Sequence, residues 1–363
     1  MNPTQHLRDQ GQSLWLDNIS RELLDKGTLS RYILELSVSG LTSNPAIFEA
    51  AIRLGGAYDA AIRAKTIEGK SGAELFFDLA LADIERAADL FAPMHHATGG
   101  IDGWVSLEVS PLMADDAAAT IAQAAALHAR ARRRNLFIKI PGTQAGLVAI
   151  EALIAAGIPV NVTLLFSCAQ YLAAAEAYMR GIERRLAAGL DPALASVASI
   201  FVSRWDAAVP PEVSETFRNR LGIAVAMQVY AAYRELLAAP RWQGLAAHGA
   251  RPQRLLWAST GSKDAALSDT YYVEALVAAD TINTMPEKTL LAFAAHGKVP
   301  AALTGDAGTA LATLAEFERE GVDLEALAAR LQREGVAAFA RSYGELLYRI
   351  AEKSAGPRPT GAQ

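Results

Sequence analysis

The feature that most constrains the fold is a repeated alternation of short apolar segments with longer stretches of helical spacing. Each apolar segment ends in small or polar residues, and we expect each to be a strand. Alternating strands and helices predict a parallel sheet, and eight repeats in 363 residues favour a closed (β/α)₈ TIM barrel with additional helices. The expected strands are Ser13–Ile19, Val38–Asn44, Trp104–Ser110, Leu136–Pro141, Val160–Phe166, Val197–Val202, Arg254–Ser259 and Asp280–Thr284.

The domain prediction is a single barrel over residues 1–363, with its core at about 13–300. Further helices are expected over 301–353, followed by a frayed tail over 354–363 that is rich in Gly and Pro. Amphipathic spacing does not decide whether these helices cover the barrel mouth, cover its base or build a subunit interface. The individual helices are expected at Leu311–Glu320, Leu324–Glu334 and Val336–Glu352.

Composition and charge exclude several function classes. A net charge of −5 gives no electrostatic case for nucleic acid or an anionic membrane as the main partner. No segment offers about 20 uninterrupted apolar residues, and the single cysteine, Cys168, fits a reducing compartment. Without matching ligands near the adjacent His95 and His96, we expect no metal site. A cytoplasmic protein is predicted, and a homodimer is left open.

Lys139 is the one charged residue in the apolar segment Leu136–Pro141. Burial disfavours the charged form of an amine, so a lysine in such a strand can supply the free amine that attacks a carbonyl carbon. The alternative is a lysine that pairs with a carboxylate and serves structure or anion binding only. This segment by itself does not decide between them.

Nearly every expected strand carries a polar residue near its end, where barrel enzymes place their chemistry. Residues two apart on a strand face the same side, as do Asn161 with Thr163 and Phe137 with Lys139. One such residue could be structural, but a lysine, two carboxylates and several amides and hydroxyls together indicate a site for proton transfer. The polar residues are Asp17, Thr42, Asn44, Glu108, Lys139, Asn161, Thr163, Ser199 and Ser259.

Several of these residues lie in segments that closely resemble transaldolases, in particular the longer bacterial form of that family. The resemblance runs in the same order from about Ser13 to about Pro286. Its segments are Ser13-Leu14-Trp15-Leu16-Asp17, Leu41-Thr42-Ser43-Asn44-Pro45, Ile138-Lys139-Ile140-Pro141-Gly142-Thr143, Asn161-Val162-Thr163-Leu164-Leu165-Phe166-Ser167 and Asn283-Thr284-Met285-Pro286. The resemblance implies a class I aldolase-like barrel, and it implies an enzyme of the non-oxidative pentose phosphate pathway.

The resemblance implies transfer of a dihydroxyacetone unit from sedoheptulose 7-phosphate or fructose 6-phosphate to an aldose phosphate, without a cofactor. Lys139 matches the family's Schiff-base lysine, and Asp17 matches its acid/base aspartate. Glu108 and Thr163 match the pair that positions a water for the proton transfers of Schiff-base formation.

Substrate contacts are implied in the same way. Thr42, Asn44, Asn161 and Ser199 are expected near the hydroxyls of the three-carbon unit, and Phe201 matches an aromatic position that bears on transfer against cleavage. For the phosphate we expect Arg204, Ser259 and Lys263. Shorter transaldolases carry an arginine in this last loop, so a surface lysine is an equal alternative for Lys263.

Two other functions share part of this set of residues. A fructose-6-phosphate aldolase would share the lysine and the barrel, but these relatives are much shorter and usually carry tyrosine where this chain has Phe201. A sugar-phosphate-binding barrel that has lost catalysis conflicts with the intact set of Asp17, Glu108, Lys139 and Thr163.

The substitution Lys139→Met tests the Schiff-base hypothesis. Methionine fills similar space but has no amine, so turnover should be abolished while the fold is retained. Product formation and the far-ultraviolet circular dichroism spectrum measure the two effects. Substantial remaining turnover in the folded variant would contradict the hypothesis.

Overall fold

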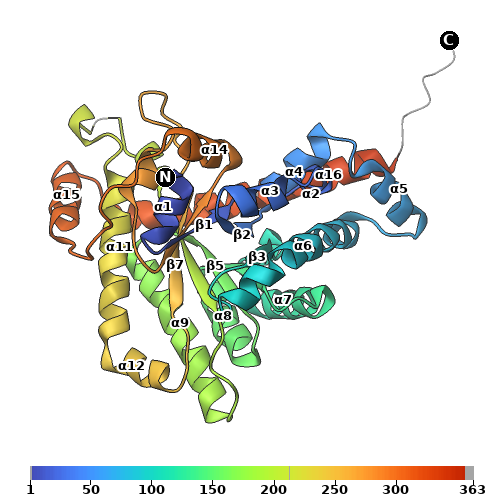
Figure 1. Ribbon diagram of the computed structural model, residues 1–363, viewed down its shortest axis with the longest axis horizontal. Coiled ribbons are helices and arrows are strands. Elements are labelled where there is room, and N and C mark those ends of the chain that lie inside the picture. Colours follow the sequence, from blue (N-terminus) through green and yellow to red (C-terminus); the bar gives the residue numbers. More distant parts are fainter. Residues whose placement is uncertain (1, 212, 356–363) are drawn as a thin grey trace.

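The protein is a closed barrel of eight parallel strands in the computed structural model, which describes residues 2–211 and 213–355. Consecutive strands are hydrogen-bonded neighbours, and β8 pairs with β1 to close the barrel. The labelled strands lie at the centre of the molecule, with helices around them (Figure 1). The predicted (β/α)₈ barrel is confirmed. The strands are β1 Gln12–Leu16, β2 Val38–Thr42, β3 Trp104–Glu108, β4 Leu136–Pro141, β5 Val160–Leu165, β6 Ser196–Phe201, β7 Gln253–Ala258 and β8 Thr281–Met285.

Six predicted strands end earlier than expected, β5, β6 and β7 by one residue and β1, β2 and β3 by two or three. β1 ends at Leu16 and β2 at Thr42, so Asp17 and Asn44 lie just after their strands. Asn44 leaves the strand because it is the N-cap of the next helix, where its side chain accepts a hydrogen bond from the backbone N–H of Ile47.

Helices connect the strands and pack around the barrel. Among the described residues, the long connections between β2 and β3 and between β6 and β7 each contain three α-helices. The helices are α1 Pro3–Asp9, α2 Arg21–Asp25, α3 Thr28–Glu35, α4 Pro45–Leu54, α5 Asp59–Ile67, α6 Gly72–Ala97, α7 Ala117–Ala131, α8 Gln144–Ala156, α9 Cys168–Ala187, α10 Ser203–Ala207, α11 Leu221–Ala238, α12 Pro240–Ala247, α13 Tyr271–Ala275, α14 Glu287–His296, α15 Gly308–Arg319 and α16 Leu324–Ser354, with short 3₁₀ turns η1 Pro111–Met113 and η2 Glu215–Phe217.

An aromatic layer fills the barrel interior beneath the polar strand ends. The ring of Phe137 stacks on Trp104 at 4.1 Å and on Trp15 at 6.2 Å, measured between ring centroids. Gly40 makes room for Trp15, because a Cβ atom at this position would lie 2.6 Å from Cε2 of the indole. The side-chain period of two then places Asp17 and Lys139 above this layer, at the carboxyl ends of their strands.

The C-terminal region differs from its prediction. The segments Leu324–Glu334 and Val336–Glu352 form one continuous helix, α16, because Gly335 is helical and packs closely against Leu164 of β5. This helix runs beside α4 (Figure 1). Its Gln332 and Phe339 lie at the barrel mouth, which agrees with one of the three placements, while a subunit interface stays an open alternative.

The predicted tail, residues 354–363, lies mostly outside the described residues. Ser354 is the last residue of α16, whereas 356–363 lie outside the part of the chain that the structure describes. The division into a single domain with a core at 13–300 stays a prediction.

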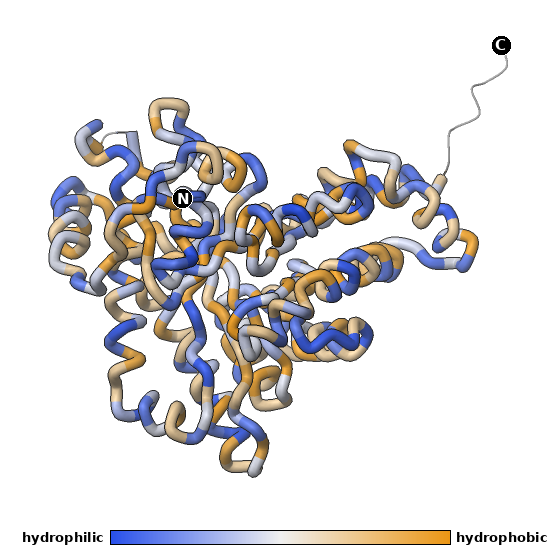
Figure 2. Tube along the Cα trace, viewed as in Figure 1, coloured by the Kyte–Doolittle hydropathy of each residue, from blue (hydrophilic) through white to orange (hydrophobic). Residues whose placement is uncertain are grey.

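Hydrophobic and hydrophilic residues alternate along the outer helices, as helices packed by one face require (Figure 2). Among residues 2–211 and 213–355, no helix is long and apolar enough to span a membrane.

The start of α8 allows a matched test of packing. A Cβ atom on Gly146 would lie 1.9 Å from the carbonyl oxygen of Pro141, so Gly146→Ala should force β4 and α8 apart and destabilise the fold by about 2 kcal/mol or more. Gly244 in α12 has no atom within 4 Å of that position, so Gly244→Ala should stabilise by about 0.5–1 kcal/mol. Urea unfolding measures both, and equal effects would contradict this account.

Candidate active site

Lys139 is buried in the barrel interior and faces a carboxylate on the neighbouring strand. The register of β3 with β4 places Glu108 beside Lys139. Nζ of Lys139 lies 3.3 Å from Oε2 of Glu108 and donates a hydrogen bond to the carbonyl oxygen of Ser43 at 3.2 Å. The lysine therefore has a compensating negative charge at close range, which an isolated buried ammonium would lack.

Glu108 has an unusual acidity because of this environment. Burial raises its pKa to about 7, although the positive charge of Lys139 acts to lower it. The negative charge of Asp17 raises it further. A carboxyl group with a pKa near neutrality can both accept and donate a proton under physiological conditions.

Asp17 follows β1 and lies at the same end of the barrel. Its Oδ1 accepts a hydrogen bond of 2.7 Å from the hydroxyl of Thr42, and that hydroxyl also lies 2.7 Å from Oγ1 of Thr284. Burial raises the pKa of Asp17, against the lowering effects of Lys139, Thr42 and Arg204 in that order. Asp17 is partly exposed, on the side of the pocket, so it can reach a bound molecule.

Thr163 completes this group from β5. Its side chain is fully buried, and its hydroxyl has no hydrogen-bond partner among the described residues. Because β5 pairs with β4 so that Thr163 lies beside Pro141, its hydroxyl belongs to the layer just above Lys139. A buried hydroxyl without a protein partner is suited to bind water or a ligand.

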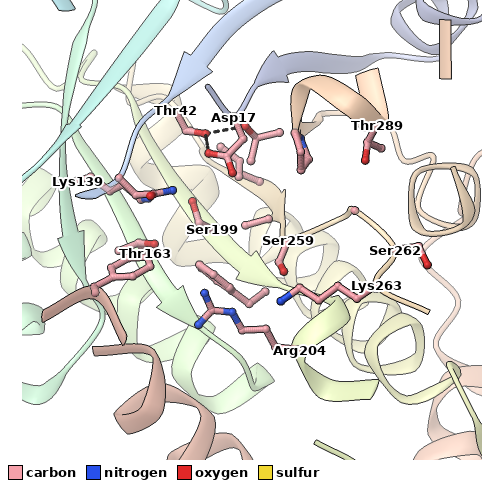
Figure 3. Close-up of a pocket in the computed structure, with 18 of the residues that line it drawn as sticks. Asp17, Thr42, Lys139, Thr163, Ser199, Arg204, Ser259, Ser262, Lys263 and Thr289 are labelled. Atoms are coloured by element: carbon pink, nitrogen blue, oxygen red, sulfur yellow. Dashed lines mark hydrogen bonds between the residues drawn. The ribbon is translucent and has the colours of Figure 1, made fainter. Parts of the chain in front are cut away.

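These side chains surround one pocket of about 300 Å³ (Figure 3). Most of the residues predicted for the site line it. Glu108 and Asn161 do not, since Glu108 lies behind Lys139 and Asn161 lies deeper in the barrel. The predicted residues that do line it are Asp17, Thr42, Asn44, Lys139, Thr163, Ser199, Phe201, Arg204, Ser259 and Lys263.

Asn161 organises the layer below the pocket. Its amide nitrogen donates to Oγ of Ser106 at 3.2 Å, and its Oδ1 accepts from Oγ of Ser199 at 2.7 Å. Both ends of the Asn161 amide are therefore used within the protein, and Ser199 is the member of this network that reaches the pocket.

Positive side chains gather at one side of the pocket. The guanidinium of Arg204, in α10, lies 4.8 Å from the ring of Phe201 and 5.9 Å from that of Phe339. Lys263 extends toward the same region, and Ser259 lies between them and the barrel (Figure 3). Arginine held between aromatic rings presents its donors in a fixed direction, which suits recognition of a phosphate group.

Sequence reasoning missed several lining residues. Phe339 of α16 has its ring 5.5 Å from Nζ of Lys139, and Thr284 and Lys288 follow from β8. Thr284 stood within a family segment, which was a usable signal. Phe339 gave none, because an apolar residue in an amphipathic helix is also typical of ordinary packing.

The described residues contain no group of three or more histidine, cysteine or acidic side chains arranged to hold a metal ion. The functional groups at the pocket are a buried amine, hydroxyls and the carboxyl group of Asp17, and the carboxyl group of Glu108 lies behind the amine; the pKa values of both carboxyl groups are raised. This set can perform amine addition to a carbonyl, with proton transfer. Fold and site together define an aldolase-type (β/α)₈ barrel.

Comparison with known proteins places the chain more closely. The model of the Transaldolase/Fructose-6-phosphate aldolase family matches residues 14–350. A transaldolase of Parafrankia sp. (strain EAN1pec) is 45% identical over 97% of this chain and 98% of its own length. A transaldolase of Thermobifida fusca (strain YX) is also 45% identical, over 98% and 99%. The chain belongs to the transaldolase/fructose-6-phosphate aldolase family.

The acidity of Glu108 can be measured directly. Its carboxyl group should titrate near pH 7, followed by carbon-13 NMR of glutamate-labelled protein, with Glu108→Gln identifying the signal. Because the charge of Lys139 lowers the pKa of Glu108, Lys139→Met should move the midpoint upward. A midpoint near 4.5 in the unsubstituted protein would show that burial does not raise it.

Proposed function

We propose that the protein transfers a dihydroxyacetone unit between sugar phosphates, converting sedoheptulose 7-phosphate and glyceraldehyde 3-phosphate to erythrose 4-phosphate and fructose 6-phosphate. The protein is an enzyme of the transaldolase type, since relatives named transaldolase match it over nearly its whole length. The observation that carries the mechanism is the buried amine of Lys139, which lies 3.3 Å from Glu108 and lines the pocket.

Lys139 is the nucleophile in this proposal. Its neutral amine adds to the ketone carbon, C2, of the ketose phosphate and gives a carbinolamine. Loss of water forms an iminium ion, in which nitrogen is bonded to C2. The barrel strand holds the amine in place, so that it is aligned before the substrate arrives.

Asp17 acts in the cleavage step. Its carboxylate takes the proton of the hydroxyl on C4 while the bond between C3 and C4 breaks. The electron pair of that bond moves into the iminium, which becomes a neutral enamine, and the aldose phosphate leaves as an aldehyde. The raised pKa of Asp17 strengthens it as a base, and the Thr42 hydrogen bond orients it.

Glu108 and Thr163 serve the formation and loss of the carbinolamine. The amine must lose a proton, and the departing hydroxyl must gain one. A water held by the unpartnered Thr163 hydroxyl can relay these protons to and from Glu108, whose pKa near 7 suits both directions. Glu108 does not line the pocket, so a water is needed for it to serve the substrate.

The remaining residues orient the sugar phosphate. Ser199 and the amide of Asn44 are placed to bind hydroxyls of the three-carbon unit. Thr42 acts indirectly, through its hydrogen bond to Asp17. Arg204, Ser259 and Lys263 bind the phosphate, as their shared position at one side of the pocket supports.

Transfer is favoured over simple cleavage for a physical reason. The enamine must persist until an aldehyde acceptor arrives, and protonation of it by water would release free dihydroxyacetone. Two apolar rings, Phe201 and Phe339, form part of the wall of this pocket, and neither carries a hydroxyl that could donate a proton. The fructose-6-phosphate aldolase and non-catalytic alternatives are therefore not preferred.

Other expectations are extensions of this proposal. We place the enzyme in the non-oxidative pentose phosphate pathway and in the cytoplasm. A homodimer and the absence of nucleic-acid partners stay predictions.

Trapping with borohydride tests the function. Fructose 6-phosphate should leave a reduced three-carbon adduct on Lys139 after borohydride treatment, detected by intact and peptide mass, with glyceraldehyde 3-phosphate released. Lys139→Met is the control that should give no adduct. With erythrose 4-phosphate present, sedoheptulose 7-phosphate should form in preference to free dihydroxyacetone. Absence of any adduct in the folded, unsubstituted protein would contradict the proposal.

A further inference from the structure

Helix α16 is bonded to the ends of the two strands that carry Lys139 and Thr163. Nε2 of Gln332 donates to the carbonyl oxygens of Gly142 and Leu164, each at 3.0 Å. Gly142 directly follows β4, and Leu164 is the next-to-last residue of β5. One side-chain amide therefore connects both strand ends, at 190 and 168 residues of sequence separation.

The end of β5 has a backbone conformation that needs support. Leu164 has a φ of 58°, in the left-handed region that leucine rarely adopts. The pairing of β5 with β6 changes register between Val162 and Leu165, which is an irregularity of the bulge type. Such conformations persist where surrounding contacts hold them, and they re-aim the side chains beside them.

Thr163 lies within this irregularity, directly before Leu164. Its carbonyl oxygen accepts a hydrogen bond of 2.8 Å from the backbone N–H of Gly142, and the next carbonyl, of Leu164, accepts from Gln332. The backbone is thus held on both sides of the left-handed residue. The hydroxyl of Thr163 is left buried, without a protein partner among the described residues, at the pocket that contains Lys139.

Gly335 allows the helix to come close enough for these bonds. A Cβ atom at this position would lie 2.8 Å from Cδ2 of Leu164. Gly335 is three residues after Gln332, so both lie on one face of α16 and both contact Leu164 at the end of β5.

We propose that Gln332 is a positioning residue for the reaction: its amide holds Leu164 left-handed and thereby directs the Thr163 hydroxyl toward the water that serves Lys139 and Glu108. This inference rests on the proposed function. It assigns to the C-terminal helix a part in forming the Schiff base, in addition to covering the pocket.

Gln332→Met tests this role, because methionine keeps the length of the side chain and removes both hydrogen bonds. We expect kcat and the rate of borohydride-trapped adduct formation to fall about tenfold, with KM changed less than about twofold, since misplaced groups slow chemistry more than binding. Wild-type kcat in this variant would overturn the inference. Gln332→Asn, one methylene shorter, is the second variant should Gln332→Met not fold.

A rescue experiment separates positioning from general stability. Glycine adopts a positive φ without strain, so Leu164→Gly in the Gln332→Met background should recover most of the lost kcat, although the protein loses a buried side chain. Leu164→Ala in the same background is the matched control, because it loses the side chain without gaining the backbone freedom, and it should not recover activity. Equal kcat in the two double variants would refute the positioning role.

A cycle with Thr163 identifies the route of the effect. If Gln332 acts through Thr163, Gln332→Met should lower kcat no further in a Thr163→Val protein, and additive losses would contradict this. The unsubstituted protein keeps the two proposals apart. If it gives no adduct on Lys139, the proposed function fails; if it gives the adduct no faster than Gln332→Met, only the role of Gln332 fails.

Discussion

Closure of the eight strands into one barrel is the constraint on which the site depends. A closed sheet has no edge, so the register between neighbours is set all the way round, and interior side chains of adjacent strands must meet. That register brings Glu108 beside Lys139, at 3.3 Å, above a buried layer of stacked aromatic rings. Desolvation then does two things at once. It strengthens the electrostatic interaction between Lys139 and Glu108, and it raises the pKa of Glu108 to about 7.

The C-terminal helix α16 adds a further wall to the site from outside the barrel. The mouth of a barrel is open unless another element covers it, and here α16 covers part of it. Gln332 of this helix lies 190 and 168 residues after Gly142 and Leu164, which it contacts. Phe339 of this helix faces both Lys139 and Arg204. The result is a pocket with apolar walls at the amine and positive charge at one side. Such a pocket can retain a reactive enamine while leaving polar groups for the sugar phosphate.

The sequence was informative where chemistry and periodicity coincide. Lys139 stands out because a charge in an apolar strand is costly, and the period of two correctly grouped it with Thr163 and Asp17 at one end of the barrel. The sequence was less informative at the strand ends: Asn44 was expected in β2, but it lies after the strand and caps α4. It also broke α16 at Gly335, because glycine usually weakens helices, whereas here it allows close packing on Leu164.

The amino-acid sequence by itself determined the order of strands and helices, and it supplied the buried amine, the carboxyl groups and the hydroxyls at the strand ends. These are local properties, set by apolar periodicity and by the cost of burying charge. Only the tertiary structure decided that Asn161 accepts a hydrogen bond from Ser199 inside the barrel and that Glu108 pairs with Lys139 without lining the pocket. It also decided that Gln332 bonds to two strand ends and that Phe339 lines the pocket. Contacts between residues so distant along the chain follow from register and packing, which no local pattern specifies.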